Sequence, residues 1–342
     1  MNQTATAVRF GILGAARIAP AALVHPAWVI PNCEVVAIAA RDHGRAQAFA
    51  HQHNIPITSP TYEALLADPC INAVYVPLVA SLHREWCERA ILAGMHVLCE
   101  KPLATNVADA QHLVALAEDR GVILAEAFHY RYHPLCTRVL EITRSGELGK
   151  IDRVEAVFAN AVPPDLPRSA SVYWDARLGG GATLHNGCYT AHILRTVMRS
   201  TPAVTRATTE SWEEDESADA ALEADLTFHD GTKGRLGASF IAHNREISLR
   251  LTTSAGELYA DNFVLPHIDD SESGLNRGSV VITTSEGSRR EVFPMIPTYV
   301  YQLDAFVESV RTGALLPTTG VDIIENARLL EELLSAAGSD HI

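Results

Sequence analysis

In the segment Glu100-Lys101-Pro102, a lysine lies where an apolar stretch has just ended. The preceding residues His96–Cys99 predict the end of a buried β-strand, and a new helix is expected to start near Thr105. Ligands of α/β folds bind at the carboxyl ends of the strands, so a cation here would lie beside a ligand. Burial and neighbouring charges readily shift the pKa of a lysine, which suits it to acid–base chemistry. A solvated lysine in a turn is the alternative interpretation of this tripeptide taken alone.

A second candidate site is a turn near the N-terminus. Val8–Leu13 predicts a short strand, and Gly14-Ala15-Ala16-Arg17-Ile18-Ala19 leads into a helix that reaches about Trp28. With a second strand over Glu34–Ala40, these residues form a βαβ unit of about thirty residues, as in dinucleotide-binding folds. The glycine permits the tight turn, and free N–H groups at the helix N-terminus bind phosphate. Alanines replace the second and third glycines of the usual pattern, so this motif alone is weak.

Arg41 ends the second predicted strand, at the place where a dinucleotide fold meets the adenosine ribose. An acidic residue there binds the 2′-hydroxyl of NAD, whereas an arginine binds the 2′-phosphate of NADP. Arg45 follows one helical turn later and is also suited to pair with a dianion. We therefore expect NADP as the cofactor, while the adjacent Asp42 keeps NAD possible. The alternative is an ordinary solubilising arginine at a strand end.

A third candidate lies in the second half of the chain, where three glycines precede a helix, over Gly179–His192. His185, Tyr189 and His192 are spaced by four and three residues, so they share one helix face. A tyrosine hydroxyl can donate a proton to a carbonyl oxygen, and a nearby lysine would stabilise the developing oxyanion. A buried tyrosine with two satisfied histidines is the alternative. A metal bound by His185, Cys188 and His192 lacks a closed set of four ligands, and we expect none.

Strands and helices alternate through the first third of the chain. After the βαβ unit we expect a helix over Glu63–Ala67, a strand over Ala73–Val76, a helix over Ser81–Ala93, a strand over Met95–Cys99, a helix over Val107–Arg120 and a strand over Val122–Phe128. This alternation predicts an α/β fold with a parallel sheet covered on both faces.

The pattern changes after Phe128, where longer segments alternate apolar and polar residues. We expect strands over Ile151–Asn160, Thr205–Glu213, Leu222–His229, Arg235–Ile241 and Ile247–Thr253, and helices over Pro134–Arg144, Gly187–Arg199, Tyr299–Thr312 and Asp322–Ala337. These elements predict an α/β domain with a large, open, mostly antiparallel sheet. We place the first domain at residues 1–124 and the second at 125–342.

Composition narrows the class of protein. A net charge of −14 argues against nucleic acid and anionic membranes as partners. No apolar run of the 342 residues reaches membrane-spanning length, and the first residues lack the features of a signal peptide. Six cysteines occur without CxxC pairs, as in proteins of a reducing compartment. We expect a cytoplasmic protein, with the acidic run Glu213–Glu216 as a solvated loop.

Taken in order, these motifs resemble the glucose–fructose oxidoreductase/inositol dehydrogenase (Gfo/Idh/MocA) family over nearly the whole chain. The resemblance rests on the Gly11–Ala19 turn, Arg41, Glu100-Lys101-Pro102, Ala125-Glu126-Ala127-Phe128 and Gly179–His192. The pattern is most similar to the branch of dimeric dihydrodiol dehydrogenase, D-xylose dehydrogenase and glucose–fructose oxidoreductase. It implies a Rossmann domain, a second α/β domain whose sheet builds a homodimer or homotetramer, and NADP- or NAD-dependent hydride transfer on a sugar-like hydroxyl or carbonyl.

The resemblance also implies roles for individual residues. Lys101 matches a lysine that contacts the nicotinamide ribose and a substrate oxygen, and Tyr189 falls where this branch has its catalytic tyrosine. The bond between Lys101 and Pro102 is often cis in relatives. The implied cofactor-binding residues are Gly14, Ala15, Ala16, Arg17, Ile18, Arg41, Pro77, Leu78, His83, Glu100 and Lys101. The implied substrate-binding residues are Lys101, Trp174, Arg177, His185, Tyr189 and His192.

Two departures from the family pattern concern the substrate. His185 and His192 stand where relatives carry aspartates, so the usual acceptors for substrate hydroxyls are absent. We therefore expect a ligand with a carbonyl or a negative group, such as a keto-sugar of a sugar nucleotide or a sugar acid. Two other functions stay open: a non-catalytic NADP-sensing regulator, and a glycosidase that uses NAD for transient oxidation of a sugar.

Overall fold

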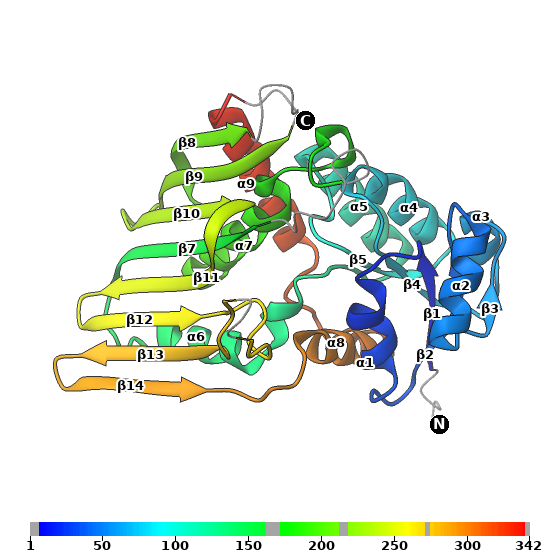
Figure 1. Ribbon diagram of the computed structural model, residues 1–342, viewed down its shortest axis with the longest axis horizontal. Helices are drawn as coiled ribbons and strands as arrows, with labels where there is room; N and C mark the ends of the chain where they lie inside the picture. Colours follow the sequence, from blue (N-terminus) through cyan, green and yellow to red (C-terminus); the bar gives the residue numbers. More distant parts are fainter. Residues whose placement is uncertain (1–6, 162–171, 212–217, 271–273, 339–342) are drawn as a thin grey trace. The chain divides into compact units, whose positions relative to one another are not determined.

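The computed structural model describes residues 7–161, 172–211, 218–270 and 274–338 (Figure 1). The chain forms two compact units. The first comprises the residues up to His129 together with Tyr299–Ile324, and the second comprises Tyr130–Thr298 together with the residues from Glu325 onward. Two consecutive domains along the chain are predicted from the sequence. In the structure, residues 299–324 group with the first unit. The acidic run Glu213–Glu216 lies outside the described residues.

The first unit contains a six-stranded sheet with the order β3-β2-β1-β4-β5-β6. Its strands pair in parallel, with the bounds β1 (Val8–Leu13), β2 (Cys33–Ala39), β3 (Ile57–Thr58), β4 (Ala73–Val76), β5 (His96–Cys99) and β6 (Leu124–Glu126). This is the strand order of the dinucleotide-binding Rossmann fold, with its switch point between β1 and β4. The predicted parallel sheet is therefore confirmed.

Most helices of the first unit connect these strands, and local residues determine where some of them end. A π-helical turn over Pro20–Val24 continues into α1 (His25–Ala27), and the other helices are α2 (His43–His53), α3 (Tyr62–Leu66), α4 (Ala80–Leu92), α5 (Val107–Arg120) and α8 (Thr298–Thr312). The Asn106 side chain caps α5 by accepting from the Asp109 N–H at 2.8 Å, and Gly121 ends the helix in the left-handed region. Phe306 of α8 packs on Phe10 of β1 with ring centroids 5.6 Å apart, which adds α8 to the core.

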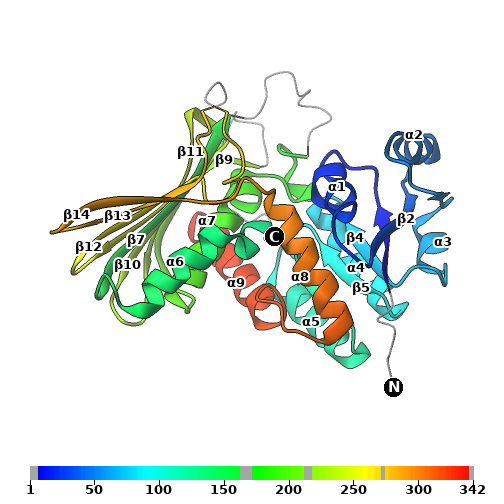
Figure 2. The same ribbon diagram turned by 90° about the horizontal axis from the view of Figure 1, so that it is seen from below.

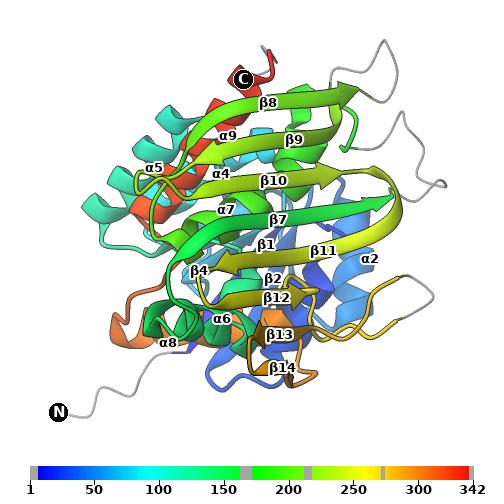
Figure 3. The same cartoon turned by 90° about the vertical axis from the view of Figure 1, so that its left-hand side faces the viewer.

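The second unit contains an eight-stranded sheet with the order β14-β13-β12-β11-β7-β10-β9-β8 (Figure 3). The strands are β7 (Ile151–Ala161), β8 (Ala203–Ser211), β9 (Asp219–Thr227), β10 (Lys233–Ser239), β11 (Ile241–Thr253), β12 (Gly256–Asp261), β13 (Ser279–Thr284) and β14 (Gly287–Val292). β7 and β10 pair in parallel, while the other described pairings are antiparallel. The prediction of a large, mostly antiparallel sheet is confirmed.

One face of this sheet carries the helices α6 (Pro134–Ser145) and α7 (Cys188–Met198) (Figure 2). The last helix of the chain is α9 (Val321–Ala336). Val154, Ala156 and Phe158 of β7 are buried on the helix-covered face. Residues at the alternate positions form charged pairs, such as Arg235 with Glu223 at 2.9 Å and Arg250 with Glu257 at 2.6 Å. The opposite face of the sheet is therefore polar, as period-two alternation requires.

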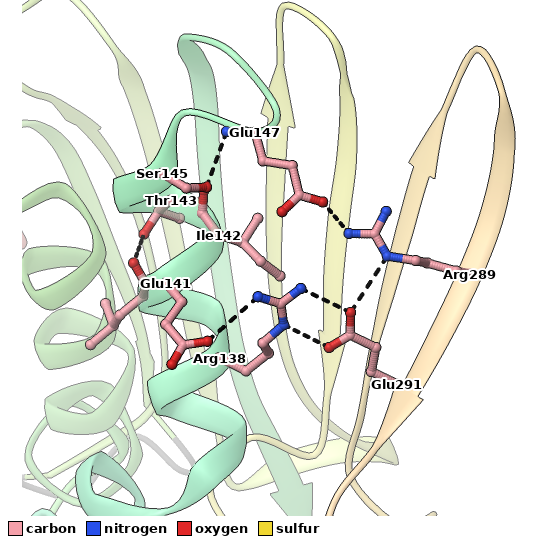
Figure 4. Close-up of polar contacts among 9 residues, drawn as sticks. Arg138, Glu141, Ile142, Thr143, Ser145, Glu147, Arg289 and Glu291 are labelled. Atoms are coloured by element: carbon pink, nitrogen blue, oxygen red, sulfur yellow. Dashed lines mark hydrogen bonds and ion pairs between the residues drawn. The ribbon is translucent and has the colours of Figure 1, made fainter.

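The edge strand β14 is held mainly by polar contacts (Figure 4). Its Glu291 accepts two hydrogen bonds from the Arg138 guanidinium of α6, at 2.8 and 3.1 Å. Arg289 pairs with Glu147 and also lies 3.5 Å from Glu291. Arg138 further approaches Glu141 at 3.5 Å. Because no residue of β14 is fully buried, this network, rather than a hydrophobic face, fixes the strand to α6.

Across the described residues, none of the helices combines the length and the apolar character needed to cross a bilayer.

Candidate active site

The turn after β1 has the geometry of a phosphate-binding turn. Gly14 has a φ of 112°, and a Cβ there would lie 2.9 Å from Leu78 Cδ2, so only glycine fits. Its N–H donates to the Ala39 carbonyl at 2.7 Å, and the Ala16 N–H donates to the Gly14 carbonyl at 2.9 Å. Ala19 has a φ of −58°, so this alanine replaces a glycine without backbone strain. The turn thus keeps the close backbone approach that a pyrophosphate requires.

Four side chains from the end of β2, α2 and α3 bear on this turn, and one of them contacts it directly. Arg41 is exposed after the end of β2, and Arg45 Nη2 donates to the Ala15 carbonyl at 3.2 Å. Asp42 caps α2 by accepting from the Arg45 N–H at 3.0 Å, so its carboxylate is used in the local fold. Tyr62, which the sequence did not single out, packs edge-on against Trp86 at 4.6 Å. Burial raises the pKa of Tyr62, and the charges of Arg41 and Arg45 partly offset this rise.

The Glu100-Lys101-Pro102 loop follows β5, as predicted, and its Lys101–Pro102 peptide bond is cis. Buried Tyr75 of β4 donates its hydroxyl to Glu100 Oε1 at 2.6 Å. Burial raises the pKa of Glu100, whereas the neighbouring Lys101 charge and the Tyr75 hydrogen bond lower it. Burial and the nearby Glu100 carboxylate raise the pKa of Tyr299 on α8. Lys101 therefore directly follows a carboxyl group that is held by a buried tyrosine of the sheet.

One predicted cofactor residue, His83 of α4, contacts this loop, and two others lie in the loop before α4. His83 is buried, and its two ring nitrogens lie 2.8 Å from the Pro102 carbonyl and 2.9 Å from the Leu78 carbonyl. Pro77 is buried at the end of β4, and Leu78 packs against Gly14. The imidazole of His83 thus contacts two backbone carbonyls of the loops.

The helix predicted in the second unit begins with a π-helical turn over Thr183–Gly187 and continues as α7. Gly181 has a φ of 106°, and a Cβ there would lie 2.2 Å from Asp219 Oδ1. Asp219 Oδ2 accepts from both the N–H and the hydroxyl of Thr183 at 2.8 Å. Burial raises the pKa of Asp219, and the Thr183 hydrogen bonds offset part of this rise. Asp219 caps the helix from β9, 36 residues away, which no local sequence signal indicates.

Two of the three residues of the predicted helix face, Tyr189 and His192, lie against the Tyr130 ring. Tyr189 is buried between Tyr130 and Phe158, with ring centroids 6.0 and 5.5 Å away. Buried His192 lies beside Tyr130, and its Nδ1 is 2.5 Å from the Tyr130 hydroxyl. Tyr130 was not singled out from the sequence, because its partner lies 62 residues away.

The other substrate candidates divide into two groups. His185 and Trp174 both approach Phe240, with ring centroids 5.8 and 6.2 Å away, and Tyr173 lies 4.8 Å from His185. The side chain of Arg177 is 87% exposed and forms two hydrogen bonds with Asp175, at 2.8 and 3.0 Å. The aromatic candidates therefore cluster, whereas Arg177 points to solvent and is held by its own turn.

A metal site requires several ligating side chains in one place. No three His, Cys, Asp or Glu residues lie together as a metal site among the positions that the structure describes. The Cys188 thiol, one of the three residues of the metal alternative, donates to the His185 carbonyl at 3.4 Å.

A Rossmann sheet with a glycine turn after its first strand defines the class of dinucleotide-binding proteins. Residues 8–128 match the model of the oxidoreductase family with an NAD-binding Rossmann fold, and residues 136–259 match the GFO/IDH/MocA C-terminal domain. The chain belongs to the GFO/IDH/MocA family and is an oxidoreductase, which confirms the resemblance found in the sequence.

Sequence similarity to known enzymes supports this assignment over most of the chain. A "D-xylose 1-dehydrogenase (NADP(+)) 2" of Haloferax volcanii is 33% identical over 304 residues, covering 89% of each chain. A "dTDP-3,4-didehydro-2,6-dideoxy-alpha-D-glucose 3-reductase" of Saccharopolyspora spinosa is 31% identical and covers 95% of this chain and 96% of its own. A crystal structure of a 3-ketoreductase from Actinomadura kijaniata, in complex with NADP and TDP-benzene, is 28% identical with a TM-score of 0.87 and covers 97% of this chain and 98% of its own.

Proposed function

We propose that this protein transfers a hydride between NADP(H) and the carbinol or carbonyl carbon of a sugar-like substrate, with Tyr189 as proton donor or acceptor and Lys101 as its partner. The observation that carries this proposal is topological. β1, β4 and β5 are parallel neighbours, so the Gly14 turn and the Lys101 loop leave the same edge of one sheet. That edge is where such sheets bind nucleotides and place the reacting groups.

NADP rather than NAD is proposed from the arginines at the turn. The Arg45 guanidinium reaches the Ala15 carbonyl, and Arg41 lies exposed at the end of β2. Two guanidinium groups beside the turn match a 2′-phosphate, because arginine binds phosphate oxygens in a fork. The Asp42 carboxylate caps α2, which favours its local role over contact with a 2′-hydroxyl. The NADP in the names of the Haloferax volcanii and Actinomadura kijaniata relatives agrees with this choice.

The residues fit a bound dinucleotide, which would accept or supply the hydride. The Gly14–Ile18 backbone would hold its diphosphate, and Arg41 with Arg45 its 2′-phosphate. During oxidation, the ionised Tyr189 phenolate takes the proton of the substrate hydroxyl as the carbon loses a hydride. During reduction, the neutral Tyr189 phenol gives its proton to the carbonyl oxygen. The Lys101 ammonium stabilises the negative charge that develops on the oxygen. His185 or His192 would pass the proton onward.

The lysine and tyrosine roles also have support from a relative. Structures of the Actinomadura kijaniata 3-ketoreductase include one with a lysine replaced by alanine and one with a tyrosine replaced by phenylalanine. These are the two residue types that we propose for the chemistry here.

For the substrate, we propose a keto-sugar attached to a nucleoside diphosphate, or another sugar with a carbonyl or negative group. The imidazole of His185 offers one donor and one acceptor where the family pattern has a carboxylate. The relatives named as dTDP-sugar 3-reductases support this class, whereas the D-xylose dehydrogenase supports a neutral sugar.

We propose that a homodimer forms through the polar face of the second sheet, opposite to the face that carries α6 and α7. Its charged pairs, Arg235–Glu223 and Arg250–Glu257, offer both signs of charge to a second copy. Light scattering at a series of protein concentrations gives the mass of the assembly. A constant monomer mass would contradict this part of the proposal, and charge reversal at Arg235 should weaken a dimer.

A substrate screen tests the activity. The purified protein would be incubated with NADP and free sugars, sugar acids or inositols, and with NADPH and dTDP-keto-sugars, while the absorbance of the reduced cofactor is followed. We expect net turnover with at least one class, and faster turnover with the nucleotide-linked keto-sugars than with xylose. Cofactor binding without turnover would point to a regulator. Cleavage of a glycoside without net change in the cofactor would point to a glycosidase.

A further inference from the structure

His83 occupies a position between the two loops that the proposed function requires. It lies in the second turn of α4 and is 1% exposed. Its Nε2 is 2.9 Å from the carbonyl of Leu78, in the loop after β4. Its Nδ1 is 2.8 Å from the carbonyl of Pro102, in the loop after β5. One side chain thus bridges the backbone of two loops at neighbouring strand ends.

The bridge extends to both candidate sites of the first unit. Leu78 packs on the phosphate-binding turn, since a Cβ on Gly14 would lie 2.9 Å from Leu78 Cδ2. Pro102 directly follows Lys101. Because proline has no backbone N–H, the carbonyl is its main-chain hydrogen-bonding group. A displacement of either loop would therefore break a contact of the same imidazole. The contacts run in an unbroken series from Gly14 through Leu78, His83 and Pro102 to Lys101.

The hydrogen-bonding capacity of the imidazole limits which side chains could form this bridge. Both neighbours are carbonyl oxygens, which accept hydrogen bonds, whereas a neutral imidazole has one N–H to donate. Burial lowers the pKa of His83, while the carbonyls of Pro102 and Leu78 act in the opposite direction. A hydrophobic side chain of similar size would leave both carbonyls without this donor, and a leucine would fill much of the space. The site therefore favours a compact side chain that carries a hydrogen-bond donor.

We propose that His83 is a positioning residue, which fixes the Lys101 loop against the phosphate-binding turn and so sets the place of the Lys101 ammonium. This inference rests on the proposed function, because it gives Lys101 the chemical role. It assigns His83 an action through Pro102 and Leu78 rather than a contact with the cofactor. A misplacement of a reacting group by about 1 Å costs on the order of 10²-fold in rate, which sets the size of the expected effect.

The test compares His83→Leu, His83→Gln and a matched control, His51→Leu, at an exposed histidine of α2 in the same unit. We expect His83→Leu to lower kcat about 10- to 100-fold, with a much smaller change in the KM of the substrate. His83→Gln keeps an N–H donor and should recover a large part of the rate. His51→Leu should leave kcat unchanged. Circular dichroism and NADP titration would verify that each variant is folded and binds the cofactor.

A double-mutant cycle separates positioning of Lys101 from a general structural role. If His83 acts through Lys101, His83→Leu should change the residual rate of a Lys101→Ala enzyme by less than about 3-fold. Equal losses in both backgrounds would overturn the proposal, and so would a folded His83→Leu enzyme with wild-type kcat. A Lys101→Ala enzyme with normal turnover would instead overturn the proposed function. If His83→Leu does not fold, the cycle is performed with His83→Ala, which also removes the donor and for which the same outcomes apply.

Discussion

Tyr75 and Glu100 are joined by a 2.6 Å hydrogen bond from the tyrosine hydroxyl to Oε1 of the carboxyl group. Tyr75 is fully buried in β4, and Glu100 follows the neighbouring strand β5. The pair places an acidic group directly before Lys101 in a partly buried environment. Glu100 therefore supports the lysine loop in two ways: Tyr75 fixes its position, and its charge interacts with that of Lys101.

Removal of this hydroxyl in Tyr75→Phe should destabilise the protein in a pH-dependent manner. A hydrogen bond to a charged group contributes about 1.5–3 kcal/mol, so a loss of that order in the free energy of unfolding is expected when Glu100 is ionised. Burial raises the folded-state pKa of Glu100 above its unfolded value, so the carboxyl favours folding at low pH, and this contribution is lost as the pH rises through the folded pKa. Loss of the Tyr75 donor raises that pKa further. The difference between variant and wild type should therefore be larger at about pH 8 than at about pH 4.

Urea unfolding at these two pH values would measure the effect. Tyr62→Phe is the matched control, because its hydroxyl lies near Arg41 rather than near a carboxylate. A Tyr75→Phe penalty that is independent of pH would contradict the role of Glu100 in the pair.

Cofactor preference should depend on the arginines beside the turn. NADP(H) should bind more tightly than NAD(H) by about 1–3 kcal/mol, the range of charge-assisted hydrogen bonds. Arg41→Ala and Arg45→Ala should each reduce this difference, and the double variant should remove most of it. Arg120→Ala, at a partly exposed site of α5, is the control. Fluorescence titration with both cofactors measures the preference, and equal wild-type affinities would refute it.

The identity of residue 185 should influence substrate choice. In His185→Asp, a carboxylate that accepts hydrogen bonds from sugar hydroxyls replaces an imidazole packed 4.8 Å from the Tyr173 ring. We expect kcat/KM to shift towards neutral sugars and away from substrates with a negative group. His243→Asp, at an exposed position of β11, should leave the ratio unchanged. Efficient oxidation of free xylose or glucose by the wild type would contradict this account of the pocket.

The Arg138–Glu291 contact should stabilise the edge of the second sheet only while the carboxylate is ionised. The Arg138 hydrogen bonds hold the pKa of Glu291 below its usual value, so this stability is present above the unfolded pKa and is lost as the pH falls through the folded one. Both side chains are partly exposed, so Arg138→Ala should cost no more than about 1 kcal/mol at neutral pH. The cost should vanish as the pH falls through the folded-state pKa of Glu291 and the carboxylate becomes protonated. Thermal unfolding of Arg138→Ala and Arg138→Lys across this range would check the sign.

Several elements could be predicted from the sequence because their signals are local. The bounds of β1, β4 and α5 agree with the predicted ranges, since each has an apolar run or a cap and a terminating glycine. Strands β12, β13 and β14 were not predicted. They are six residues long, and β14 has almost no buried face, so alternation gives little signal. Helix α2 was implied by the placement of Arg45 one helical turn after Arg41, but no range was predicted for it, because its small and polar residues show no apolar stripe.

The candidate site shows the same division. The turn, the arginines and the lysine loop are read from adjacent residues, and the structure keeps them at the ends of parallel strands. Asp219 on Thr183 and Tyr130 on His192 are contacts between residues 36 and 62 positions apart. Such pairs depend on how strands and helices pack, which the composition and periodicity of one sequence do not specify.

The central claim is that Lys101 and Tyr189 act as one catalytic unit. Its most direct test is the steady-state rate of cofactor reduction or oxidation by Lys101→Ala, Tyr189→Phe and the double variant on the best substrate of the screen. We expect each single variant to lower kcat by about 10²–10⁴-fold while NADP affinity changes far less. The double variant should be only slightly slower than the worse single one, because residues that act together are not additive. Near-normal turnover by Tyr189→Phe, or losses that multiply in the double variant, would contradict the account.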